Sequence, residues 1–75
     1  MKIIEVEKGQ FLFTKENDFS DSYFFLLRGK LELVYPVGDD FKFARNADEG
    51  YIFVQGTDYA RAVSDKCEII EFSKS

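Results

Sequence analysis

Residues 20–35 read SDSYFFLLRGKLELVY, two apolar runs separated by Arg28-Gly29-Lys30. The first run, residues 23–27, does not alternate between apolar and polar side chains, which predicts a strand at the centre of the core that is covered on both faces or nearly so. The second run alternates around Glu32, as a half-buried strand does. Gly29 can supply the positive φ of a tight turn, so we expect the two runs to form a hairpin.

The rest of the chain repeats this pattern of short apolar runs and turn-prone groups, and no segment has the spacing of a helix. Phe11 and Phe13 are expected to face one way around Leu12. Eight strands are predicted, at about residues 3–7, 10–15, 22–28, 30–35, 41–45, 50–54, 59–63 and 67–72. The predicted fold is a single all-β domain over residues 1–75, an eight-stranded jelly-roll without flanking helices.

The composition is that of a small globular domain, with 45% hydrophobic and 32% charged residues in 75. Nine Phe and four Tyr are more rings than a core of this size needs, so we expect several at the surface, where a cluster would mark a protein partner. The net charge of −4 argues against nucleic acid as a partner. The single cysteine and the absence of a signal peptide or membrane-length apolar run indicate a soluble intracellular protein, in the cytoplasm or an organelle, without membrane insertion.

The residue types needed for catalysis are mostly missing. The chain has no histidine, which removes His-based acid–base chemistry, most catalytic triads and most zinc sites. Cys67 lies in a strand-like run and is interpreted as a structural thiol. Glu16-Asn17-Asp18, with Ser20 and Asp21, offers oxygens to calcium but lacks the EF-hand spacing, and it is interpreted as a solvated turn. We therefore predict no catalytic residue, no metal and no cofactor.

The order of residues 8–35 resembles the first half of a cyclic nucleotide-binding domain, the family found in catabolite-activator-type regulators, protein kinase A regulatory subunits and cyclic-nucleotide-gated channels. Gly9 precedes the early strand, Asp21-Ser22 precedes Tyr23-Phe24-Phe25-Leu26, and Gly29 precedes Leu31-Glu32-Leu33. Residues 48–53 and 61–72 resemble the later half. The resemblance implies an eight-stranded β-roll.

The resemblance fails where the family binds its ligand, between the sixth and seventh strands. There the family has a Gly-Glu pair for the ribose, a short helix whose amides face the cyclic phosphate, and an Arg that neutralises it. In this chain Val54 and Gln55 occupy the Gly and Glu positions, the helix is missing, and Gly56 stands where the Arg is expected. Thr57 follows at the family's Ser or Thr position. The resemblance therefore implies that cyclic nucleotide binding has been lost.

Two hypotheses of function follow. The first is a non-catalytic module that acts as a structural or protein-interaction subunit, or an adaptor, in a larger multisubunit assembly. Its candidate interface residues are Tyr51, Phe53 and Tyr59 beside the shortened connection, with Phe41 and Phe43 as an alternative face. The second is a regulatory domain that still binds cyclic AMP, cyclic GMP or another small anion through Gln55, Thr57 and Arg61. An enzyme is the least favoured class.

Overall fold

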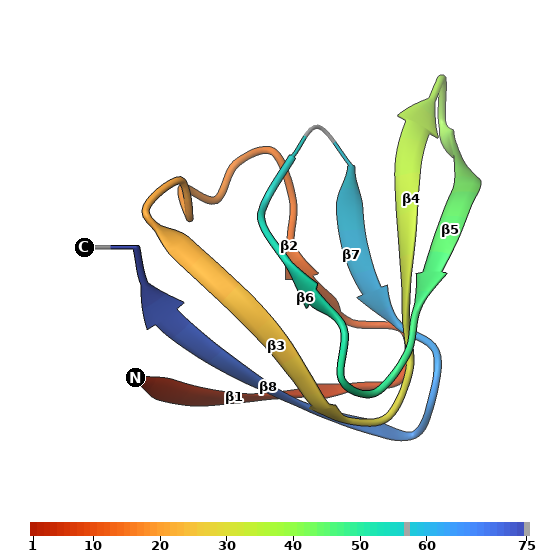
Figure 1. Cartoon of the computed structure of the whole chain (residues 1–75). Coiled ribbons are helices and arrows are strands. Elements are labelled where there is room, and N and C mark those ends of the chain that lie inside the picture. The colour runs from red at the N-terminus through yellow and green to blue at the C-terminus, as the bar shows by residue number, and fades with distance from the viewer. Residues whose placement is uncertain (57, 75) are drawn as a thin grey trace.

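The computed structural model describes residues 1–56 and 58–74, and in this part of the chain it is all β (Figure 1). The strands are β1 (Lys2–Glu7), β2 (Phe11–Phe13), β3 (Ser22–Arg28), β4 (Leu31–Val37), β5 (Asp40–Ala47), β6 (Ile52–Phe53), β7 (Tyr59–Ala62) and β8 (Lys66–Ser73). All eight predicted strands are confirmed. Among the described residues, no helix is long and apolar enough to span a membrane.

The strands form two antiparallel four-stranded sheets. The first sheet has the order β1-β8-β3-β6 and the second has the order β2-β7-β4-β5 (Figure 1). The core lies between them, because alternate residues of each strand point inward. Its fully buried side chains include Phe24 and Leu26 of β3, Leu31 of β4 and Ile69 of β8.

The strand β3 is covered on one face, and the prediction of cover on both faces was wrong. Phe24 and Leu26 are fully buried, whereas Tyr23 and Leu27 on the outer face are 38% and 39% exposed. The second sheet covers only the inner face, and on the outer face the Tyr23 ring stacks on Phe72 of the neighbouring β8. An apolar row crosses the outside of this sheet and consists of Ile3, Ile70, Phe25 and Ile52.

The turn at Gly29 joins the two sheets rather than closing a hairpin, which corrects a second prediction. Strand β3 belongs to the first sheet and β4 to the second, and they do not pair. Gly29 has a φ of 94°, in the left-handed region. A Cβ at this position would lie 2.7 Å from both the Lys66 carbonyl oxygen and the Ser64 hydroxyl oxygen, and 2.9 Å from the Cys67 sulfur. Gly29 is therefore needed for its backbone conformation and for close contact with β8.

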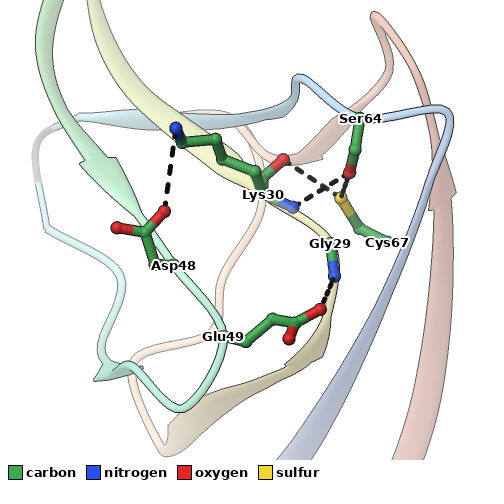
Figure 2. A network of polar contacts seen from close by, with 6 residues as sticks. All are labelled: Gly29, Lys30, Asp48, Glu49, Ser64 and Cys67. Carbon is green, nitrogen blue, oxygen red and sulfur yellow. Dashed lines mark hydrogen bonds and ion pairs between the residues drawn. The ribbon is translucent and has the colours of Figure 1, made fainter.

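Hydrogen bonds fix the chain on both sides of this crossing (Figure 2). The Lys30 amide donates to the Ser64 hydroxyl at 2.9 Å, and the Cys67 thiol donates to the Lys30 carbonyl at 3.2 Å. The Gly29 amide donates to the Glu49 carboxylate at 2.9 Å. Because Cys67 is fully buried in this contact, its thiol has a packing role.

The expected alternation of β2 is interrupted by a bulge. Phe11 pairs with Arg61 and Phe13 pairs with Ala60, with a register shift between them. Phe13 is therefore buried in the core, while Phe11 lies on the outside of the second sheet beside Arg61. The prediction that both rings face one way was wrong because a bulge adds one residue to a strand and reverses the side-chain order beyond it.

Replacing Gly29 by alanine is expected to destabilise the fold more than the same change at Gly9. Both glycines have positive φ, 94° and 85°, but a Cβ at Gly9 would meet no atom within 4 Å. We expect Gly9→Ala to lower the free energy of unfolding by about 1–2 kcal/mol and Gly29→Ala by about 2–5 kcal/mol, measured by urea denaturation. Equal losses in the two variants would contradict a steric role for Gly29.

Candidate functional site

The connection between β6 and β7, residues 54–58, is where the resemblance places a ligand. It is short, and Val54 and Gly56 are exposed along it. Thr57, a predicted ligand residue, lies outside the described residues. No pocket opens in the surface that the described residues form.

The side chain of Gln55 connects this segment to the loop between β2 and β3. Its Oε1 accepts a hydrogen bond from the Phe19 amide at 2.7 Å. Its Nε2 donates to the Thr14 carbonyl and to the Asn17 carbonyl, both at 2.9 Å. Both amide hydrogens of Gln55 are thus used within the chain. The partners also fix the orientation of the side-chain amide, because the Phe19 N–H requires an oxygen and the Thr14 and Asn17 carbonyls require the NH₂ group.

The loop held by Gln55 has further internal order. The Thr14 amide donates to the Asn17 side-chain oxygen at 2.8 Å. The Ser20 hydroxyl and the Ser20 amide donate to the Asp18 carboxylate at 2.8 Å and 3.2 Å, and these bonds hold the pKa of Asp18 below its ordinary value. The Phe19 ring packs edge-on against Phe24 in the core at 5.3 Å between centroids.

Aromatic rings fill the space between the sheets next to this connection. Phe53 stacks on Phe24 at 5.5 Å and on Tyr51 at 5.7 Å between centroids, and Phe13 lies 5.5 Å from Phe24. Phe53 is only 6% exposed, so it presents almost no surface to a partner. Tyr51 is half-buried, and the guanidinium of Arg45 lies over its ring at 5.5 Å.

Arg61 lies on the outer face of the second sheet, on the opposite side of β7 from the buried Ala60 and Ala62. Its Nε donates to the Glu32 carboxylate at 2.7 Å, and its Nη2 pairs with the same oxygen. Its guanidinium carbon lies 5.6 Å from the centroid of Phe11 and 5.5 Å from that of Phe41. The described structure therefore does not bring Arg61 and Gln55 to a common site.

Three rings surround this arginine and form what we call the outer aromatic cluster: Phe11, Phe41 and Tyr59, with centroids 5.4–5.8 Å apart. Tyr59 is 8% exposed beneath the other two, whereas Phe41 is 40% exposed and the adjacent Phe43 is 57% exposed. Of the predicted interface residues, Phe41 and Phe43 therefore offer the most surface.

Sequence reasoning missed Phe11 in this cluster and Glu32 as the partner of Arg61. Glu32 and Arg61 carry opposite charges in alternating strands, which is a signal for pairing. The pairing of β4 with β7 was needed to use that signal, because the two residues are separated by 29 positions.

No protein-family model matches the chain, and a comparison with curated proteins finds no match. Solved structures do match. A mutant of CooA from Carboxydothermus hydrogenoformans superposes with a TM-score of 0.83 at 16% identity, covering 96% of this chain and 48% of CooA. A cyclic nucleotide-binding-like protein from Brucella abortus gives 0.76 at 18% identity, covering 97% and 68%.

The regulatory domain of Toxoplasma gondii protein kinase A, solved with cyclic AMP, gives a TM-score of 0.78 at 14% identity and covers 97% of this chain. This chain spans 71% of the other chain in one structure of the EAL enzyme Bd1971 and 21% of it in another. At these identities the likeness concerns the fold. The chain thus has the fold of cyclic nucleotide-binding domains, the β-roll that the sequence resemblance implied, without flanking helices in its described part.

Proposed function

We propose that this chain is a non-catalytic, cyclic nucleotide-binding-like module that does not bind the nucleotide and serves as a structural or protein-interaction subunit of a larger assembly. The observation that carries the proposal is the set of hydrogen bonds that the Gln55 side chain forms within the chain. Gln55 holds the loop between β2 and β3 through three hydrogen bonds, at the position where the family places the glutamate that binds ribose.

The amide of Gln55 meets a chemical requirement that a carboxylate cannot meet. Two of its three partners are backbone carbonyl oxygens, Thr14 and Asn17, which need a donor. An ionised carboxylate only accepts hydrogen bonds, so a glutamate would bring its charge against these two oxygens. A nucleotide ribose competing for the amide would have to release the loop from its anchor.

The guanidinium of Arg61 also has a partner within the chain, the Glu32 carboxylate. A phosphate that used this guanidinium would have to displace or share the Glu32 carboxylate, which is itself half-buried and would lose its partner. A buried charge without a partner costs several kcal/mol. The net charge of −4 adds to the cost of bringing an anion to this chain.

The interaction role is supported by the surface beside the outer aromatic cluster. Phe41 and Phe43 expose apolar area next to an arginine packed between rings, and aromatic residues and arginine are enriched where proteins bind one another. The surface that the described residues form has no pocket in which an acid–base pair or an activated nucleophile could meet a substrate. This is the basis for proposing a non-catalytic role.

The second candidate is a regulatory domain that binds a cyclic nucleotide or another small anion. The observation that favours it is the fold, since similar structures were solved with cyclic AMP, for the Toxoplasma gondii domain, and with cyclic GMP, for the enzyme Bd1971. In this candidate the ligand would displace internal partners of Gln55 and Arg61 and would use Thr57.

A titration with ligand separates the two candidates. We expect ¹⁵N-labelled protein to show no saturable amide shifts in residues 54–61 with cyclic AMP or cyclic GMP up to about 5 mM, because any remaining affinity is worth less than about 3 kcal/mol. Adenosine 5′-monophosphate serves as the control for non-specific phosphate binding. Saturable shifts specific to a cyclic nucleotide would overturn the proposal and favour the regulatory domain.

Restoring the family's residue should destabilise this chain rather than repair a site. We expect Gln55→Glu to lower the free energy of unfolding at pH 7 by more than Gln55→Ala, which itself should cost about 1–3 kcal/mol. The folded state disfavours the charged carboxylate and raises its pKa above the unfolded value, so the glutamate variant should lose stability as the pH rises through about 4–5. Urea denaturation from pH 3.5 to 7 measures this, with the alanine variant as control. A difference between the variants that does not change with pH would contradict the role given to the amide.

A further inference from the structure

The strand β5 is an open edge of the second sheet. It is hydrogen-bonded to β4 on one side only, and it stands at one side of the molecule in the β4–β5 hairpin (Figure 1). All of its residues except Ala47 are exposed. An exposed edge strand presents unpaired backbone donors and acceptors to any chain that can lie beside it.

The two faces of β5 differ in chemistry. Phe41 and Phe43 lie on the outer face of the sheet, where Phe41 joins the outer aromatic cluster. Asp40 and Lys42 lie on the opposite face, and neither side chain forms an ion pair with another described residue. The regular part of the strand ends at Ala44, the extra residue at the register shift between β4 and β5.

These positions select one register for pairing with a second copy. If two β5 strands met antiparallel with Lys42 opposite Lys42, the like charges would repel. If they met with Phe43 at the centre, pairing would have to run through the bulge at Ala44. With Phe41 at the centre, Asp40 of each copy lies opposite Lys42 of the other, which gives two ion pairs and one ring pair.

We infer that β5 pairs antiparallel with β5 of a second copy of this chain, centred on Phe41, to form a continuous eight-stranded sheet. The twofold symmetry makes both strands contribute the same surface. The outer aromatic clusters of the two copies then become neighbours on one face of this sheet. This inference rests on the proposed function, to which it adds the partner and the contact surface.

The contact is small, so the dimer should be in equilibrium with monomer at about micromolar to millimolar concentration. Sedimentation velocity with the whole chain, from about 10 µM to about 1 mM, measures this equilibrium. In a dimer of Lys42→Asp, residues 40 and 42 of both copies are acids, and in a dimer of Asp40→Lys all four are lysines. Each variant alone should therefore self-associate at least about tenfold more weakly, because like charges repel. An equimolar mixture of the two variants should recover the affinity, because each acid then faces a lysine of the other chain.

Lys8→Asp and Asp65→Lys are the matched controls. They make the same changes of net charge in exposed turns outside β5, and they should leave the association unchanged. A wild-type chain that stays monomeric, or a dimer on which the β5 variants act no differently from the controls, overturns the inference. Neither result bears on the nucleotide titration, so failure of this pairing and failure of the proposed function are distinguishable.

Discussion

The close approach of Gly29 to β8 is the constraint on which the two-sheet arrangement depends. At this residue the chain leaves the first sheet and enters the second, and its backbone lies where any side chain would meet Lys66, Ser64 and Cys67. The buried Cys67 thiol and the half-buried Ser64 hydroxyl then bind the backbone of Lys30 and fix the start of β4 (Figure 2). Without this contact the inner faces of β3 and β4 could not enclose one core.

Two of the residues predicted as ligand contacts have hydrogen-bond partners inside the chain instead. Gln55 holds the loop between β2 and β3. The guanidinium of Arg61 lies over the rings of Phe11 and Phe41 on the outside of the roll and donates a hydrogen bond to Glu32. Each contact uses hydrogen-bonding capacity that a ligand would otherwise take. The fold is retained while its polar groups satisfy one another, which is consistent with a scaffold whose contacts with other molecules lie on its outer surface.

Local pattern was enough to predict the number of strands, their approximate places and the all-β class, because alternation and turn residues are properties of neighbouring positions. It was insufficient where the outcome depends on distant partners. A glycine before an alternating strand indicates a turn, but whether that turn closes a hairpin or crosses between sheets is set by contacts with β8. The bulge after Phe11 and the bonds of Gln55, whose partners are 36 to 41 residues away, have no local signal for the same reason.

The central claim is that the Gln55 amide is bound inside the chain, and the side-chain amide signals of the free protein test it directly. We expect the Gln55 NH₂ protons to exchange slowly with solvent and to show nuclear Overhauser contacts to the segment from Thr14 to Phe19. The other glutamine, Gln10, is exposed. Its Oε1 accepts a hydrogen bond from the Glu7 amide, and its exposed NH₂ group gives the reference for fast exchange with solvent. Gln55 signals that exchange as fast as those of Gln10 and show no contact to the loop would contradict the account.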